Sequence, residues 1–317
     1  MPGNATSWIV VVLLVVGAAQ LACGRQQPRP NFLLVVADDM GWADLGSFGS
    51  EIDTPNIDAL ARSGVMFTDF HVSMSCSPTR SMLLSGTDNH IAGLGNMGET
   101  IAPEQRGKPG YEGYLNERVV SLAEALRAGG YHTYMAGKWH LGHEPDQYPH
   151  ARGFERSFSM LFGGASFWSD MVGVLAGFQE VAEYVLDDEK LDALPADFYA
   201  TRSYTDFLID AIRQDRGDGK PFLAYLAFTT PHDPLHVPEP WRSMYRGDYG
   251  KGYEVLKAER VAGAKRLELG RGARSPRRSG RSSREAWKST QAWSTTWTTT
   301  SAGSPASSRT SASTRTR

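Results

Sequence analysis

Short apolar runs alternate with helical patterns along most of the chain. The runs at 31–37 and 221–228 are continuous and bounded by polar residues, which is typical of strands buried on both faces of a parallel sheet. We expect strands at 31–37, 65–72, 131–136 and 221–228, and helices at 54–64, 116–129 and 199–215. This alternation predicts an α/β fold, with a mostly parallel sheet flanked by helices on both faces.

An apolar run at Ile9–Ala19 precedes this region. It is short for a membrane span and suits the hydrophobic part of a signal peptide, with Gly17 and Ala19 as the small residues before a cleavage site. We therefore expect residues 1–22 to be a signal peptide and the protein to be secreted or periplasmic, with no stable membrane span after its removal. The alternatives are a retained anchor or lipidation at Cys23.

The composition changes at the other end of the chain. Residues 269–317 are rich in Ser, Thr and Arg and poor in aliphatic residues, so they predict a disordered tail. We interpret this tail as a translated wrong reading frame or a mis-joined exon, and the alternative is a basic tail. Residues 271–317 contain nine arginines, Lys288 and Glu285, so their net charge is +9. The whole chain has a net charge of −2, so residues 1–270 carry a net charge of −11. An acidic body argues against nucleic acid as a partner.

The most distinctive polar stretch is Cys76-Ser77-Pro78-Thr79-Arg80. Pro78 fits the first turn of a helix, Ser77 can cap it and Gly86 can end it. Cys76 would then lie where the helix dipole favours negative charge, with Arg80 one turn further along the same side. The alternative is a small buried cysteine that only packs. With Cys23 and Cys76 as the two cysteines, the chain has no disulfide framework.

Polar residues follow three of the expected strands. Asp38 and Asp39 come directly after 31–37, His140 follows 131–136, and His232 follows 221–228. The carboxyl ends of parallel strands share one edge of a sheet, so we expect these groups to converge there. Adjacent carboxylates favour a hard cation such as calcium or magnesium, and the alternative is a turn with solvated acids.

Lys138 and His140 are two residues apart, so their side chains point the same way in an extended segment. Lysine can hold an anionic oxygen and histidine can transfer a proton near neutral pH. Residues 149–200 predict a substrate-side insertion. Its aromatic residues could line an apolar pocket, although ordinary core packing is the favoured interpretation for most of them: Phe154, Phe158, Phe162, Phe167 and Trp168.

Several of these segments together resemble the type I sulfatases of the alkaline phosphatase superfamily, most of all the bacterial and fungal alkyl- and arylsulfatases. The resemblance runs from about Asn31 to about Arg266. It rests on Asp38-Asp39-Met40-Gly41, Thr54 to Gly64, Cys76 to Gly86, Gly137-Lys138-Trp139-His140-Leu141-Gly142, and Pro231-His232-Asp233-Pro234. It implies that residues 31–268 are the N-terminal part of a sulfatase catalytic domain.

The resemblance also implies the chemistry. Cys76 would be oxidised by a converting enzyme to formylglycine, whose hydrate is the nucleophile that cleaves a small sulfate ester. Asp38, Asp39 and the modified Cys76 would hold calcium, with magnesium as the alternative. Arg80, Lys138, His140 and His232 would complete the catalytic set.

Two other functions remain open. Phosphonate and phosphodiester hydrolases of the same superfamily share the Cys76–Arg80 pattern, and the chain could also be a non-catalytic fragment. The family's later Asp-Asn metal pair and second lysine are not found in this chain, and its sheet would be incomplete with an open apolar edge. We therefore expect little or no sulfatase turnover from the chain as written.

Overall fold

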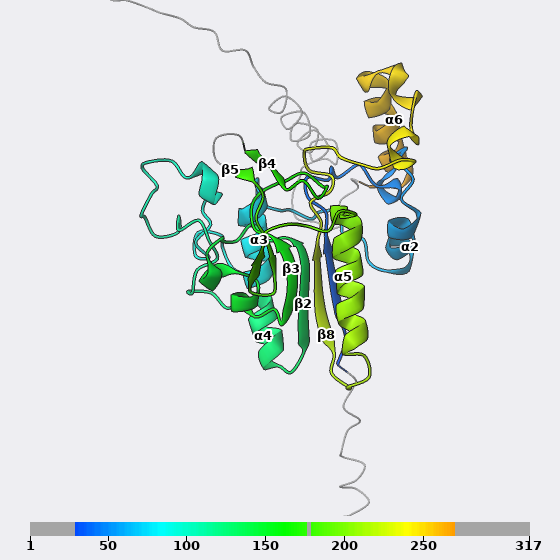
Figure 1. Ribbon diagram of the computed structural model, residues 1–317. Helices are drawn as coiled ribbons and strands as arrows, with labels where there is room; N and C mark the ends of the chain where they lie inside the picture. Colours follow the sequence, from blue (N-terminus) through cyan, green and yellow to red (C-terminus); the bar gives the residue numbers. More distant parts are fainter. Residues whose placement is uncertain (1–28, 176–178, 270–317) are drawn as a thin grey trace, which may run out of the picture. The chain divides into compact units, whose positions relative to one another are not determined.

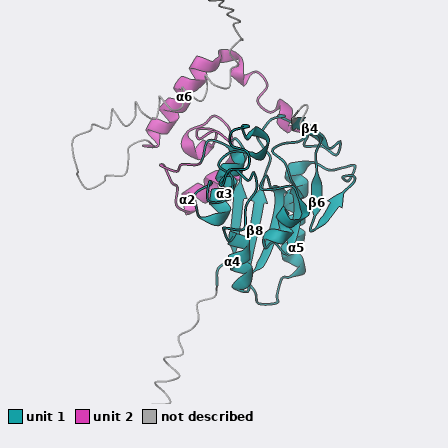
Figure 2. Ribbon diagram, turned by 90° about the vertical axis from the view of Figure 1, so that its left-hand side faces the viewer, with its two compact units in different colours: residues 1–39, 73–236 teal, residues 40–72, 237–317 magenta. Residues whose placement is uncertain are grey.

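The computed structural model describes residues 29–175 and 179–269. They form two compact units, whose described parts are residues 29–39 with 73–175 and 179–236, and residues 40–72 with 237–269; Figure 2 shows the two units in different colours. The expected signal peptide at 1–22, Cys23 and residues 270–317 of the expected tail lie outside the described residues. Leu269, the first residue of that expected tail, is described and is buried.

A six-stranded sheet forms the centre of the first unit (Figure 1). Its order is β1-β8-β2-β3-β6-β7, in which β1, β8, β2 and β3 are parallel and β6 and β7 are antiparallel additions. The prediction of a mostly parallel sheet is confirmed. The strands are β1 (Phe32–Val36), β2 (His132–Lys138), β3 (Arg156–Met160), β6 (Tyr184–Leu186), β7 (Glu189–Leu191) and β8 (Phe222–Ala227), with β4 (Val172–Leu175) and β5 (Gln179–Val181) as a separate pair.

Side chains that alternate along the central strands build a hydrophobic core on each face of the sheet. Met135 of β2 packs in one core with residues of α3 (Cys76–Ser85) and α4 (Leu122–Ala128). Its neighbours Tyr134 and Ala136 pack in the other core with α5 (Ala200–Gln214). Helices therefore cover both faces of the sheet, as the sequence predicted (Figure 1).

Strand β1 differs from its prediction. Leu34 and Val36 pack against the α3–α4 core, but Leu33 and Val35 are 63% and 51% exposed. Among the described residues, β8 is the one strand that pairs with β1, and α5 packs on β2, β8 and β3. The prediction of burial on both faces is wrong here, because β1 is an edge strand that leaves an apolar face open.

Two expected element boundaries are also wrong. Helix α4 begins at Leu122, not after Asn116, because Ser121 and Glu124 form a reciprocal capping box. Helix α3 begins at Cys76 with Ser75 at its N-cap, so Ser77 lies inside the helix and its buried hydroxyl has no partner among the described residues. The predicted C-terminal Gly86 is confirmed, with a left-handed φ of 66°.

The region 149–200, which was predicted to be a substrate-side insertion, contributes strands to the central sheet. Strand β3 joins the central sheet beside β2, and β6 extends it. Phe154 and Phe167 are buried, and Phe158 packs in the α5 core. Core packing, the favoured interpretation of these aromatic residues, is what the structure shows.

The second unit joins two segments that are far apart in the sequence. Arg260 of α6 (Tyr253–Arg266) forms ion pairs with Asp44 and Glu51, at 2.5 and 2.7 Å. Residues 65–72, which were predicted to form a strand, are irregular, and Val65, Phe67, Phe70 and Val72 are exposed. The other helical elements of this unit are α2 (Pro55–Ser63), η1 (Gly46–Phe48), η5 (Trp241–Ser243) and η6 (Asp248–Lys251).

The described residues contain no helix that is both long and apolar enough to cross a membrane.

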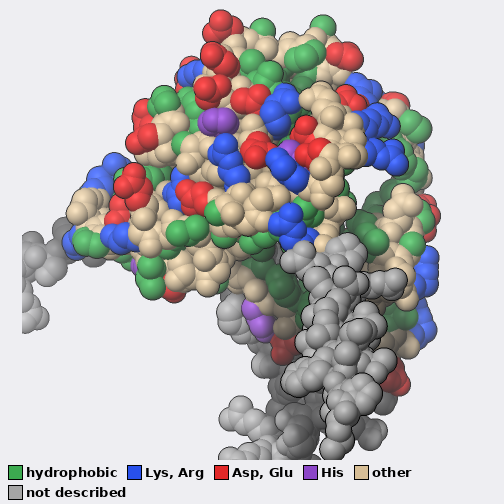
Figure 3. Space-filling model, turned by 90° about the horizontal axis from the view of Figure 1, so that it is seen from below, with side chains coloured by type: hydrophobic (Ala, Val, Ile, Leu, Met, Phe, Trp, Pro, Cys, Tyr) green, Lys and Arg blue, Asp and Glu red, His purple; other side chains and the backbone are tan. Residues whose placement is uncertain are grey.

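The face seen from below in Figure 3 carries acidic, basic and hydrophobic side chains side by side. In the first unit, the short 3-10 helices are η2 (Gly98–Thr100), η3 (Pro145–Gln147) and η4 (His150–Arg152).

Candidate active site

The candidate site lies at the carboxyl ends of the parallel strands of the first unit. Asp38 follows β1, Lys138 ends β2, and His232 follows β8. Cys76 is added from the first residue of α3. The predicted site residues are therefore brought together at the sheet edge where open α/β folds bind their ligands.

Asp38 is the buried anion of the site. It is 5% exposed, and its two carboxylate oxygens accept hydrogen bonds from Lys138 Nζ at 2.6 Å and from an Arg80 nitrogen at 3.1 Å. Burial acts to raise the pKa of Asp38, but the charges of Arg80 and Lys138 outweigh it and the net shift is downward. Asp38 is therefore ionised at neutral pH, with each oxygen already bonded to a cationic side chain.

Arg80 connects the helix that carries Cys76 to the sheet. Its guanidinium donates to the carbonyl of Lys138 at 2.8 Å and to the hydroxyl of Tyr225 at 3.3 Å, in addition to Asp38. It is 2% exposed, and these contacts satisfy its two terminal nitrogens, whereas the buried Nε has no hydrogen-bond partner among the described residues. Arg80 fixes the start of α3 relative to β2 and β8, which places Cys76 over the strand ends.

Cys76 lies in an environment that favours a negative charge. Burial acts to raise the pKa of its thiol, but hydrogen bonds with the rings of His140 and His232 and the charge of Lys138 lower it to about 6. The amino end of α3 adds to this preference. The alternative of an inert packing cysteine does not account for such an arrangement.

His232 faces Cys76 with a defined ring orientation. Its Nδ1 lies 2.5 Å from the carbonyl oxygen of Asp233, which can only accept, so Nδ1 carries the proton and Nε2 faces the site. Nε2 lies 3.6 Å from Asp39 Oδ2. The hydrogen bond with Cys76 raises the pKa of His232, while burial and the charge of Lys138 oppose that shift.

Asp39 takes part less closely than Asp38. Its side chain is 48% exposed, and its backbone has a φ of 62°, a left-handed conformation that is uncommon for residues other than glycine. His140 has a similar φ of 56°. The segment from Lys138 to His140 is therefore not fully extended, yet both side chains reach the surroundings of Cys76. Backbone strain of this kind is common at functional sites.

Sequence reasoning missed one residue of the site. Glu99 of η2 accepts a hydrogen bond from His140 Nε2 at 2.9 Å; His140 is buried, and the Glu99 side chain is 11% exposed. Burial acts to raise the pKa of Glu99, but its hydrogen bond and ion pair with His140 bring it below its usual value. Glu99 lies in a glycine-rich stretch that predicts only an irregular loop, so no local pattern could have revealed it.

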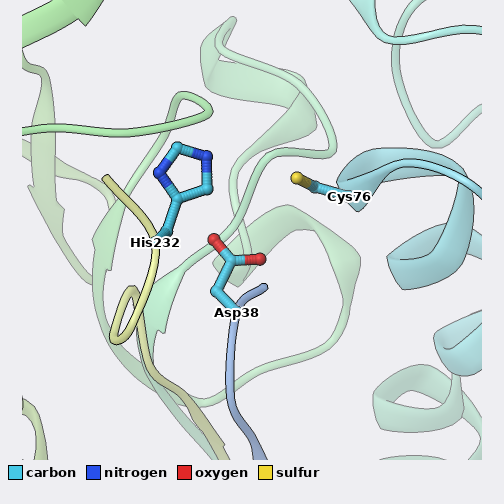
Figure 4. Close-up of side chains that lie close together, drawn as sticks. All are labelled: Asp38, Cys76 and His232. Carbon is cyan, nitrogen blue, oxygen red and sulfur yellow. The ribbon is translucent and has the colours of Figure 1, made fainter. Parts of the chain in front are cut away.

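Three side chains at the site could bind a metal ion. One ligand atom each of Asp38, Cys76 and His232 lies within 4.8 Å of the other two, and Figure 4 shows the three side chains pointing toward a common space. The ionised Asp38 offers the oxygen ligands that hard cations prefer, whereas the exposed Asp39 is not one of the three clustered side chains. The donor set therefore fits a divalent cation, although both oxygens of Asp38 are also paired with Arg80 and Lys138.

A cavity of about 340 Å³ lies beside the segment that directly follows His232. Its walls come from β4, the loop before it, and the segment after His232, and they offer both charged and apolar groups. The side chains that line it include Ser166, Asp170, Val172, Val174, Asp233, Pro234 and His236.

Comparison with known proteins is consistent with this site. The sulfatase family profile matches residues 30–292. The chain is 47% identical over 255 residues to an uncharacterised sulfatase of Schizosaccharomyces pombe, covering 77% of this chain and 45% of that protein. It is 40% identical over 264 residues to an arylsulfatase of Klebsiella aerogenes, covering 82% and 54%.

The fold of the chain is also similar to that of a solved structure. The crystal structure of Ps i-CgsB superposes with a TM-score of 0.58 at 28% identity, covering 76% of this chain and 56% of that one. The chain thus spans about half the length of the curated relatives it matches. The matched segment, the parallel sheet and the Cys76 site together show that the chain belongs to the sulfatase family.

Proposed function

We propose that the Cys76 site is that of a sulfuric ester hydrolase, which cleaves an alkyl or aryl sulfate to an alcohol or phenol and sulfate. The observation that carries this proposal is the convergence on Cys76 of a buried lysine, two histidines and an ionised aspartate. A sulfate ester is anionic, so a site for it needs fixed positive charge and proton donors close to the nucleophile.

Cys76 stands in the structure for the residue that reacts. In the proposed enzyme its Sγ marks the position of the oxygens of formylglycine, which a separate converting enzyme would produce. When present, formylglycine supplies a hydrated aldehyde whose hydroxyl attacks sulfur. The histidine rings that hydrogen-bond the thiol are placed to interact with those hydroxyl groups instead.

A divalent cation would be held by Asp38, Asp39 and the modified residue 76. Calcium fits these hard oxygen donors, and magnesium is the alternative. The cation would supply positive charge for the nucleophile and the sulfate group. These residues offer fewer oxygens than the six or more that calcium usually takes, so water and the sulfate group would supply further ligands.

Lys138 and His232 are the side chains best placed to bind the sulfate oxygens. Lys138 has three N–H donors and uses one for Asp38, so others remain for an anion. It is fully buried, which strengthens its interaction with a charged substrate. His232, with its raised pKa, can donate from Nε2 to the same group or to the departing alcohol.

The leaving alcohol would occupy the cavity next to His232. Val172, Val174 and Pro234 offer apolar contacts, whereas Asp170 and Asp233 can accept hydrogen bonds from hydroxyl groups. This mixture suits an organic alcohol or phenol that also carries polar substituents. The Ile9–Ala19 run further supports the proposal that the enzyme acts in a secreted or periplasmic setting.

The test is hydrolysis of 4-nitrophenyl sulfate by the full chain, co-expressed with a converting enzyme and used in molar excess over substrate with calcium. We expect slow release of nitrophenol that is abolished by Cys76→Ala and by a chelator. Lys138→Met should slow the release about 100-fold, since it removes a charge-stabilising contact.

The same protein is then given an aryl phosphonate ester and an aryl phosphodiester. Faster cleavage of either ester than of the sulfate would favour the phosphonate or phosphodiester hydrolase function. No release of nitrophenol from any ester by the aldehyde-containing protein would favour a non-catalytic fragment.

A further inference from the structure

Glu99 and His140 form a buried pair that the proposed mechanism does not yet use. The distance from His140 Nε2 is 2.9 Å to Oε1 and 3.2 Å to Oε2 of Glu99. The His140 side chain is 7% exposed and the Glu99 side chain is 11% exposed. The backbone at Gly163 closes over them, since a Cβ there would lie 3.0 Å from His140 Cε1 and 3.1 Å from Glu99 Oε1.

The pairing determines which ring nitrogen holds the proton. An ionised carboxylate can only accept hydrogen bonds, so His140 Nε2 must donate to Glu99. The other nitrogen, Nδ1, is buried and has no other hydrogen-bond partner among the described residues, so it is the ring nitrogen left for the Cys76 thiol. In the neutral ring, Nδ1 is therefore a lone-pair acceptor left over for the site.

We infer that Glu99 is a positioning residue, which holds the His140 ring in place and keeps its proton on Nε2, so that Nδ1 is presented to the reacting group on residue 76. This inference rests on the proposed function for its chemical meaning. His140 lowers the pKa of the Cys76 thiol through a hydrogen bond, so its ring reaches that group. Because Nε2 is bonded to Glu99, this hydrogen bond uses Nδ1, which holds the proton of the thiol when the thiolate forms.

The arrangement gives His140 a specific task. Nδ1 can take the proton of a hydroxyl on residue 76 as that oxygen bonds to sulfur or expels sulfate. The ring then carries a positive charge while Nε2–H stays bonded to the Glu99 carboxylate, which stabilises that charge. Without Glu99 the ring could turn, and the charged ring would be buried without a counter-ion.

The test is a proton NMR measurement on the full chain labelled with ¹⁵N-histidine. We expect a slowly exchanging, strongly downfield Hε2 signal of His140, assigned by its loss in His140→Gln. Glu99→Leu should abolish this signal, and Glu99→Gln should keep it with a smaller downfield shift, because the amide oxygen still accepts. Asp88→Asn is the matched control, since Asp88 pairs with the exposed His90 in the same loop, and it should leave the signal unchanged.

A wild-type protein without a protected Hε2 signal would overturn the inference, and so would a signal that survives Glu99→Leu. If Glu99→Leu does not fold, the comparison of wild type with Glu99→Gln tests the inference. An Hε2 signal at the same position in both proteins would then overturn it. In the hydrolysis assay, Glu99→Leu should slow the reaction about 10- to 100-fold, with the protein concentration that gives the half-maximal rate unchanged. A wild-type chain that hydrolyses nothing counts against the proposed function, whereas the Hε2 signal decides the role of Glu99 in either case.

Discussion

The chemistry at Cys76 depends on a few side chains that change its charge. His140, His232 and Lys138 favour the thiolate, and burial opposes it. Because the thiolate is the reactive form of cysteine, the unconverted chain should show this environment directly.

We predict that alkylation of unconverted Cys76 by iodoacetamide rises through pH 6 and levels off above it, because the thiol has a pKa of about 6 in the folded protein. Cys23→Ala removes the second thiol, so the rate reports Cys76 alone. In urea the midpoint should return to about 8.5, the ordinary value for cysteine. A midpoint near the ordinary value in the folded protein would contradict the proposed surroundings of Cys76.

At this scale, much of the site followed from the sequence. Asp38, His140 and His232 each follow an expected strand, so their convergence at one edge could be predicted from topology alone. Glu99 could not, because its link to His140 depends on how an irregular loop folds over the site. The left-handed backbone conformation of Asp39 and the exposure of its side chain were equally hidden, since no local sequence pattern signals either of them.

Strand β2 shows how an element sets the site. Gly137 lies just before Lys138 with a φ of 115°, and a Cβ there would lie 1.8 Å from the carbonyl oxygen of Ala227 in β8. The end of the strand therefore requires glycine at position 137, which lets the next residue, Lys138, reach Asp38.

We predict that Gly137→Ala destabilises the protein by about 3 kcal/mol or more, because backbone must move to relieve the clash. Gly86→Ala is the matched control: Gly86 also has a positive φ, of 66°, but a Cβ there has no atom within 4 Å. It should cost only about 1 kcal/mol. Urea denaturation measures both, and equal losses would show that the close approach of β2 to β8 does not matter.

The opposite end of β2 carries a second ionic cluster. His132 contacts Glu155 at 2.8 Å and Asp218 at 2.7 Å, and Asp215 lies 3.8 Å away. Arg127 and Lys220 also act on these carboxylates. Burial acts to lower the pKa of His132, but its carboxylate partners outweigh it and the net shift is upward.

Since the pKa of His132 is higher in the folded state, its contribution to stability is complete below the ordinary value of about 6.5 and is lost as pH rises through the folded value. We predict that His132→Gln lowers the free energy of unfolding by about 1–2 kcal/mol near pH 5.5. The loss should be much smaller near pH 9. A loss of the same size at both pH values, measured by urea denaturation, would rule out a charged His132 as its source.

Elements were predicted well where their signals are local. The helix at 199–215 and the strands at 131–136 and 221–228 were found within a few residues. The start of α4 was misplaced because the capping box of Ser121 and Glu124 was overlooked. Burial of β1 could not be read from its composition, since it depends on which elements lie beside it in space.

At the scale of the whole molecule, the division into two units was not visible in the sequence. The second unit brings Arg260 to Asp44 and Glu51 across about two thirds of the chain. No local pattern connects such segments. The first unit, in contrast, contains all of the predicted site residues. The tests of the candidate site therefore involve residues of the first unit only.

The central claim is that Cys76 is the residue converted to the nucleophile of a sulfatase. Trypsin should release it in the peptide 63–80, which contains one cysteine. The measurement is the mass of this peptide after expression with a converting enzyme, beside a known sulfatase in the same cells. We predict the mass of the aldehyde at position 76. An intact thiol at Cys76, with the known sulfatase fully converted, would contradict the account.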